Sequence, residues 1–181
     1  MAEDQKSEEP EVIGRAGHAV DAGYRRQLAS DEKTGRCAFC EPHIHTLKNK
    51  PIEPHLWEHW WLKLNDTPYP HQQHHFVMAA KKHLTNMREL NAVPGMMDEL
   101  FRIVEWVQNK YQVEAGMVAH RFGPLSGSGG TMVHAHAHIH VADKTGPVVA
   151  TVYLPDELRS RLMSGQSIYH PDWVPPVKTA A

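Results

Sequence analysis

Four histidines alternate with small or aliphatic residues after a glycine-rich segment: His134, His136, His138 and His140, within residues 127–141. Because successive side chains of a strand point to opposite faces, this alternation predicts a strand with all four imidazoles on one face, about 7 Å apart. Neighbouring imidazoles would then reach the two sides of one phosphate-sized group.

Two other interpretations of this run are less consistent with it. A disordered, histidine-rich metal-binding tail would lack the alternating aliphatic residues. A single histidine on an apolar strand is usually a hydrogen-bonded core residue, but four on one face would each demand a partner. The run therefore predicts a ligand or metal site.

Two cysteines stand three residues apart in Cys37-Ala-Phe-Cys40. This spacing suits a tight turn that holds both sulfurs on one tetrahedral ion, and a zinc site would need two further ligands. Two incidental thiols or a thioredoxin-type redox pair fit the same spacing. The pair by itself leaves these alternatives open.

Length and composition are those of an ordinary globular protein: 181 residues, 41% hydrophobic and 22% charged. One domain with a core is expected. A net charge of −2 argues against a general nucleic-acid surface but not against a mononucleotide site. Charges in residues 1–10 and the lack of a long apolar stretch argue against a signal peptide and a membrane span. We expect a cytoplasmic protein with reduced cysteines and no membrane partner.

The elements that must position these residues follow from periodicity. Alternating and aromatic runs predict strands at 57–64, 74–80, 117–122, the histidine run and 148–153. Apolar residues at three- and four-residue spacing predict a long core-facing helix at 91–113, with Pro94 near its first turn. Shorter helices are expected at 19–32 and 155–163.

These elements predict an α+β fold: an antiparallel sheet of about five strands with one long helix and shorter helices. The domain would span residues 21–163. It would lie between a disordered tail at 1–20 and an irregular tail at 164–181.

In this order, four features resemble the histidine triad (HIT) superfamily. Cys37-Ala-Phe-Cys40 is similar to the Cys-x-Phe-Cys of zinc-containing members. His75-Phe-Val-Met-Ala-Ala-Lys-Lys-His83 is similar to a run ending in Pro-Lys-x-His, with Ala80 where proline is usual. The long helix follows, and Gly129 to His138 match the Gly-x-Thr/Ser-x-x-His-x-His-x-His signature. The resemblance covers about residues 37–141 and implies a HIT-like fold.

Zinc is implied by this resemblance. In zinc-containing relatives the two cysteines are joined by the histidine after the basic pair and by the first triad histidine. The corresponding residues are Cys37, Cys40, His83 and His134. Such a Cys2His2 site is closed and would be structural.

The four histidines allow two registers for the triad. The family places Ser or Thr three residues before the first triad histidine, and Thr131 stands so before His134, whereas Val133 stands so before His136. We therefore place the triad at His134, His136 and His138. His140 then replaces an aliphatic residue of the family pattern.

The chemistry that the resemblance implies is nucleotidyl transfer. His136 would attack the α-phosphorus of a nucleotide while a backbone carbonyl holds its other ring nitrogen. His138 and Thr131 would contact phosphate oxygens or the leaving group. Nucleotide-binding residues are expected among Asn65, Asp66, Arg121, Gly129, Gly130 and His140. Arg121 occupies the region where the family usually has Asn-x-Gly.

These residues predict a HIT hydrolase or nucleotidyltransferase that acts on a dinucleoside polyphosphate or a nucleoside phosphoramidate. Many relatives pair as dimers, which implies a homodimer. Two alternatives remain open. One is a nucleotide-binding protein without significant turnover, and the other is a metal-binding protein that uses its 15 histidines and would hold several ions per chain.

Overall fold

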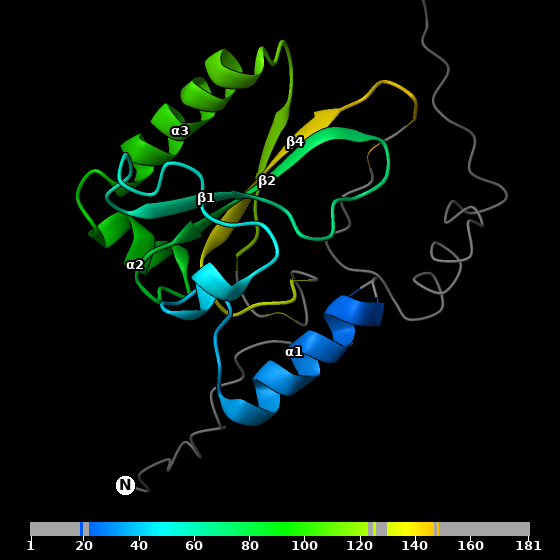
Figure 1. The fold of residues 1–181 in the computed structure, drawn as a ribbon. Helices are drawn as coiled ribbons and strands as arrows, with labels where there is room; N and C mark the ends of the chain where they lie inside the picture. The colour runs from blue at the N-terminus through cyan, green and yellow to red at the C-terminus, as the bar shows by residue number, and fades with distance from the viewer. Residues whose placement is uncertain (1–18, 20–21, 123–124, 126–129, 147, 149–181) are drawn as a thin grey trace, which may run out of the picture.

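The computed structural model describes residues 19, 22–122, 125, 130–146 and 148 (Figure 1). Several predicted features lie outside the described residues, wholly or for the most part. They are the tail at 1–20, Gly129, the strand at 148–153, the helix at 155–163 and the tail at 164–181.

One antiparallel sheet organises the described residues. Its strands are β1 (Trp60–Leu64), β2 (Gln72–Ala80), β3 (Met117–His120) and β4 (His136–Ala142). Their order across the sheet is β1-β2-β4-β3, and every neighbouring pair is antiparallel. The predicted α+β class is confirmed, and four of the expected strands lie in the described part of the chain.

The two faces of the sheet differ in chemistry. Residues directly opposite one another on neighbouring strands share a face. Trp61, Ala79 and His136 form one such row, and Lys63, Val77 and His138 form the next. His75 of β2 lies opposite His140 of β4 on this face. The polar side chains of three strands are thereby gathered above one surface.

The other face of the sheet carries the main hydrophobic core. It packs against α3 (Met96–Tyr111), whose Met96, Leu100, Ile103 and Val107 are buried as the apolar periodicity predicts. The sheet and α3 are also joined by hydrogen bonds, since Trp60 Nε1 donates to Met96 O at 2.9 Å. The Glu99 carboxylate accepts from the backbone nitrogens of residues 58 and 59. In Figure 1, α3 covers one side of the sheet.

The helix predicted at 91–113 is interrupted, so the prediction of one continuous helix is wrong. A short helix, α2 (Met87–Ala92), precedes α3, and Pro94 lies in the turn between them. Proline disfavours helical backbone at the preceding residue, and Val93 has ψ 112°. Gly95 then adopts φ 77°, a left-handed conformation that glycine tolerates, before α3 begins.

The N-terminal helix α1 (Ala22–Thr34) confirms the helix expected at 19–32. Its Leu28 and Tyr24 pack in a small cluster with Cys37 and Met132. A 3-10 turn, η2 (His43–Thr46), follows the cysteines. Figure 1 shows α1 on the opposite side of the sheet from α3. Among the described helices, none has the length and apolar character needed to span a membrane.

Candidate active site and metal site

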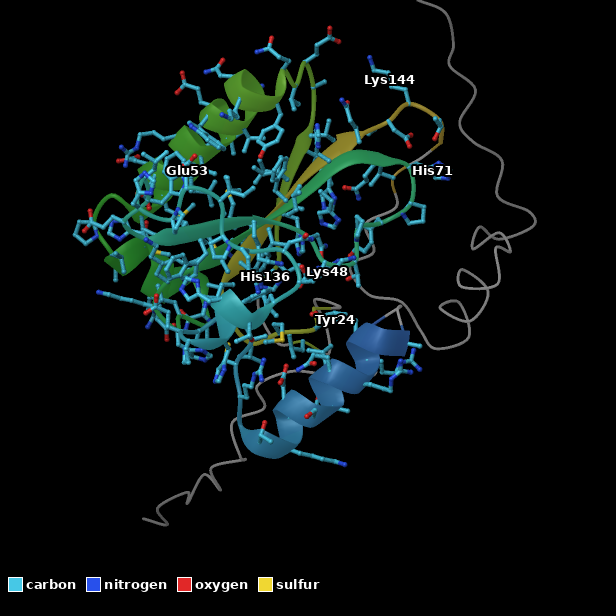
Figure 2. The ribbon with its side chains drawn as sticks, viewed as in Figure 1. Tyr24, Lys48, Glu53, His71, His136 and Lys144 are labelled. Carbon is cyan, nitrogen blue, oxygen red and sulfur yellow. The ribbon has the colours of Figure 1, made fainter. Side chains whose placement is uncertain are left out.

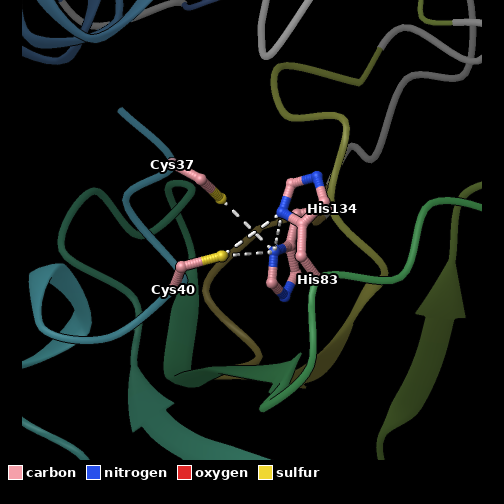
Figure 3. Close-up of side chains that lie close together, drawn as sticks. All are labelled: Cys37, Cys40, His83 and His134. Atoms are coloured by element: carbon pink, nitrogen blue, oxygen red, sulfur yellow. Dashed lines mark hydrogen bonds between the residues drawn. The ribbon is translucent and has the colours of Figure 1, made fainter. Parts of the chain in front are cut away.

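The two cysteines and two histidines assigned to zinc lie together (Figure 3). Cys37 Sγ is 3.3 Å from His134 Nδ1, and Cys40 Sγ is 3.2 Å from His83 Nδ1. Cys40 Sγ is also 3.6 Å from His134 Nδ1, and the two histidine Nδ1 atoms are 3.1 Å apart. Sequence positions 37, 40, 83 and 134 therefore converge on one point.

Local structure explains this convergence. A tight turn in which Cys40 N donates to Cys37 O at 3.3 Å brings the two sulfurs to one side. His83 follows the end of β2, and His134 precedes β4, the neighbour of β2 in the sheet. His134 thus lies before the strand, whereas the alternation had predicted a position within it. The bend before β4 turns its ring toward the cysteines.

The donor set fits a tetrahedral metal ion. Zinc binds nitrogen and sulfur at about 2.0–2.3 Å, so neighbouring ligand atoms of a tetrahedron lie roughly 3.3–3.8 Å apart. The four contacts above are within a few tenths of an ångström of that range. His134 Nε2 lies 2.7 Å from Ala80 O and must carry the proton that it donates, so Nδ1 offers its lone pair to the cluster. These four residues could therefore hold a metal ion.

His136 is held in one tautomer by the backbone. Its Nδ1–H donates to His134 O at 2.6 Å, as expected for the middle histidine of the triad, so Nε2 carries a lone pair. The ring is 7% exposed. Burial lowers the pKa of His136 to about 4 against the opposing effect of this hydrogen bond. The side chain is therefore neutral at pH 7 and lies in the interior of the molecule (Figure 2).

His138 lies beside His136, with ring centroids 5.1 Å apart. Its Nδ1 is 2.9 Å from Nε2 of His75. Burial holds the pKa of His138 well below its ordinary value and lowers the pKa of His75 to about 3. Sequence reasoning assigned no role to His75, although it begins the motif that ends at His83. Its position opposite His140 becomes visible only with the strand register.

His140 follows His136 and His138 on the same face of β4 and lies opposite His75 of β2. It stacks on Tyr69 with ring centroids 5.7 Å apart and an interplanar angle of 9°. Its Nδ1 lies 3.2 Å from Gln72 Oε1. Burial lowers the pKa of His140, and the charge of Arg121 adds to this effect. The structure thus places His140 among aromatic and amide side chains beside His75.

Asn65 and Asp66 follow β1 at the edge of this surface. Asn65 Nδ2 lies 3.2 Å from His75 Nδ1 and 3.1 Å from its Nε2. Asp66 Oδ1 accepts from Lys63 Nζ at 2.9 Å and from Asn49 N at 2.8 Å. The Lys63 side chain is 2% exposed. Sequence reasoning missed this buried cation because a lysine within an aromatic strand carries no distinguishing signal.

Thr131 is engaged by the N-terminal helix. Its Oγ1 lies 3.0 Å from the hydroxyl oxygen of Tyr24, and burial raises the pKa of Tyr24 to about 12. Thr131 is therefore hydrogen-bonded to α1 through Tyr24, which is labelled in Figure 2. No sequence signal linked the two residues.

Arg121 and Gly130 line the same cavity as His136. His120 at the end of β3 also borders this space, and it had been overlooked because it lies outside the alternating run. The cavity therefore brings together Gly130, Arg121 and His136. Gly129 lies outside the described residues.

No family model matches the chain, and no curated protein matches it. The chain is similar to several solved structures of histidine triad proteins. A hypothetical histidine triad nucleotide-binding protein from Sulfolobus tokodaii is 20% identical over 71% of this chain and 87% of its own, with a TM-score of 0.45. A HIT family hydrolase from Clostridium thermocellum is 16% identical over 59% of this chain and 90% of its own, with a TM-score of 0.45.

A third similar structure is a zinc-bound histidine triad family protein from Mycobacterium smegmatis. It is 17% identical over 60% of this chain and 78% of its own, with a TM-score of 0.39. These identities and scores are low.

Proposed function

We propose that this chain is a HIT-superfamily hydrolase or nucleotidyltransferase that acts at the α-phosphate of a nucleoside phosphate derivative. The substrate class is a dinucleoside polyphosphate or a nucleoside phosphoramidate. The observation that carries the proposal is the hydrogen bond from His136 Nδ1–H to His134 O. It leaves a neutral imidazole with its lone pair on Nε2, which is the form of histidine that can attack phosphorus.

The reaction would proceed in two displacements. His136 Nε2 donates its electron pair to the α-phosphorus, and the bond from phosphorus to the leaving oxygen or nitrogen breaks, with the electron pair going to the leaving group. Water or another acceptor then attacks the same phosphorus, and the phosphorus–nitrogen bond breaks with its pair returning to Nε2. The covalent intermediate divides one difficult displacement into two easier ones.

Neighbouring side chains would bind the substrate. His138, whose ring lies 5.1 Å from that of His136, would contact phosphate oxygens. Arg121 and the backbone of Gly129 and Gly130 would add positive charge and N–H donors. Asn65, Asp66 and His140 would border the nucleoside, and Thr131 would reach the phosphate once its contact with Tyr24 is exchanged for the substrate.

The Cys37, Cys40, His83 and His134 group would hold zinc. A closed four-ligand site supplies stability and no catalytic water. Its role would be to fix the segment before β4, and with it the His134 carbonyl that orients His136. The metal would thus support the nucleophile from outside the reaction.

A trapped intermediate tests the proposal. The purified protein is incubated with a panel of dinucleoside polyphosphates and nucleoside phosphoramidates, quenched by alkaline denaturation because a phosphorus–nitrogen bond to histidine is labile in acid, and digested for mass spectrometry. Nucleotide attached to His136, together with steady product release, is the expected result. Nucleotide binding without turnover or an intermediate would contradict the proposal and favour a binding protein.

A further inference from the structure

His75 is surrounded by hydrogen-bond donors whose direction is fixed by the backbone. The N–H of Tyr69 points to His75 Nδ1 at 3.4 Å, and a backbone N–H can only donate. Thr67 N donates to Asn65 Oδ1 at 3.1 Å, which turns the Asn65 amino group toward His75, where it lies 3.2 Å from Nδ1 and 3.1 Å from Nε2 and does not distinguish them. The Tyr69 N–H therefore identifies Nδ1 of His75 as the nitrogen that accepts, and in a neutral ring the proton resides on Nε2.

That proton has one described acceptor nearby. His75 Nε2 lies 2.9 Å from His138 Nδ1, and a contact this short between two imidazole nitrogens needs one hydrogen between them. With Nε2–H of His75 as donor, His138 Nδ1 accepts. The proton of the neutral His138 ring is then on Nε2.

We propose that His75 is a positioning residue that holds His138 with its proton on Nε2, the opposite tautomer from that of His136. One strand would then present two neighbouring imidazoles with opposite properties: a lone pair on His136 Nε2 and an N–H donor on His138. Burial holds the pKa of His138 well below its ordinary value, which keeps this ring neutral. The assignment of the two tautomers does not depend on the proposed reaction. The inference that the His138 N–H donates to a phosphate oxygen rests on the proposed function.

A bound metal ion is the alternative explanation for the close approach of these histidine rings. One ring nitrogen from each of His75, His138 and His140 lies within 4.8 Å of the others, which is close enough for a shared ion. Binding at His75 Nε2 would move the ring proton to Nδ1, where the N–H of Tyr69 already points. Two donors would then face one another, so the hydrogen bonds favour a proton between His75 and His138.

Histidine ¹⁵N chemical shifts test the assignment without any nucleotide. Protonated and unprotonated ring nitrogens resonate in separate ranges, and His138 is identified by its loss in His138→Gln. In the wild-type zinc-loaded protein we expect an unprotonated Nδ1 and a protonated Nε2 for His138, and the reverse for His136. A protonated Nδ1 on His138 would overturn the proposal.

A pair of nearly isosteric variants adds a causal test. His75→Gln can present its amino group to His138 while its oxygen accepts from Tyr69, so His138 should keep the wild-type pattern. His75→Glu offers only acceptors, so Nδ1 of His138 should become protonated. Gln73→Glu adds the same charge at an exposed site on β2 and serves as the control, with no expected change. An unchanged His138 in His75→Glu would refute the mechanism.

Nucleotide affinity and zinc content distinguish this proposal from the proposed function and from the metal-ion alternative. If the proposed function holds, nucleotide affinity should fall about tenfold or more in His75→Glu relative to His75→Gln, because a hydrogen bond to a charged phosphate is lost. Failure to bind nucleotides at all would refute the proposed function and leave the ¹⁵N result intact. A second zinc equivalent that disappears in His140→Ala but persists in His55→Ala would establish the metal account instead.

Discussion

Cys40 Sγ lies 3.2 Å from Nδ1 of His83, although the two residues are 43 positions apart in the chain. Their approach depends on β2, which ends just before His83. Loss of either side chain would leave three metal-donor atoms. A site with three protein ligands has an open coordination position, whereas a site with four is closed.

We expect close to one tightly held zinc per chain, and a loss of that zinc in Cys40→Ser. Because a structural metal site contributes directly to folding free energy, the variant should also have a lower melting temperature. Elemental analysis and thermal denaturation measure the two effects. His55→Ala removes an exposed histidine whose side chain is 73% accessible and should match the wild type in both. Unchanged zinc content in Cys40→Ser would contradict the assignment.

Leu100 on α3 should support stability and not chemistry. The side chain is 3% exposed and packs in the main core, so Leu100→Ala should lower the free energy of unfolding by about 2–5 kcal/mol. Phe101→Ala, at a neighbouring residue that is 65% exposed, should cost far less. Urea denaturation gives both values. Turnover per folded molecule should barely change, and a selective loss of turnover at normal stability would show that α3 has another role.

The triad register can be decided by the site of covalent attachment. His136→Ala should abolish both turnover and the nucleotidyl intermediate, while nucleotide binding survives through other contacts. His140→Ala should still form the intermediate, because the nucleophile is unchanged. Loss of activity in a His138 variant would not decide between registers, since residues of one catalytic unit are not additive. Nucleotide recovered on His138 would show that the other register is correct.

His75 should make stability depend on pH. Burial, with a smaller contribution from His140, lowers its pKa from 6.5 to about 3. Between these values the unfolded chain binds a proton that the folded chain does not, so stability is present above pH 6.5 and is lost as pH falls toward 3.

Chemical denaturation at about pH 7.5 and about pH 5 measures this dependence. The decrease in unfolding free energy on acidification should be smaller in His75→Gln, because glutamine takes up no proton. The cluster of Cys37, Cys40, His83 and His134 is common to both proteins, so the difference between their slopes reports on His75. An equal or steeper slope in the variant would contradict the expectation.

Local pattern predicted most of the described helices and strands, and the order of motifs predicted the ligand cluster. The apolar periodicity of α3 and the alternation of β4 follow from the sequence because each reports a single buried face. Cys37, Cys40, His83 and His134 could be assigned together because the order of motifs, and not any one spacing, resembled a known arrangement. The contacts in Figure 3 agree with that grouping.

What sequence could not supply was the partner of each side chain across the sheet. His75 meets His138 only because β2 and β4 pair in one register, and sequence alone does not specify which residues of distant strands lie opposite. The contact between Tyr24 and Thr131 spans 107 positions and depends on how α1 docks. The predicted helix began at residue 91, whereas α3 begins at Met96, because the apolar periodicity conceals the Val93–Gly95 turn that separates α3 from α2.

The cluster of Cys37, Cys40, His83 and His134 can be completed only late in synthesis. Cys37 and His134 are 97 positions apart, and β1, β2, α2, α3 and β3 all lie between them. A growing chain that ends before His134 therefore holds at most three of the four ligands, and its cysteines leave the ribosome long before their last partner. Closing a loop of this length opposes early binding through chain entropy, which grows with the logarithm of loop length. His134 immediately precedes β4, which bears His136, His138 and His140, so the cluster and that strand are synthesised together.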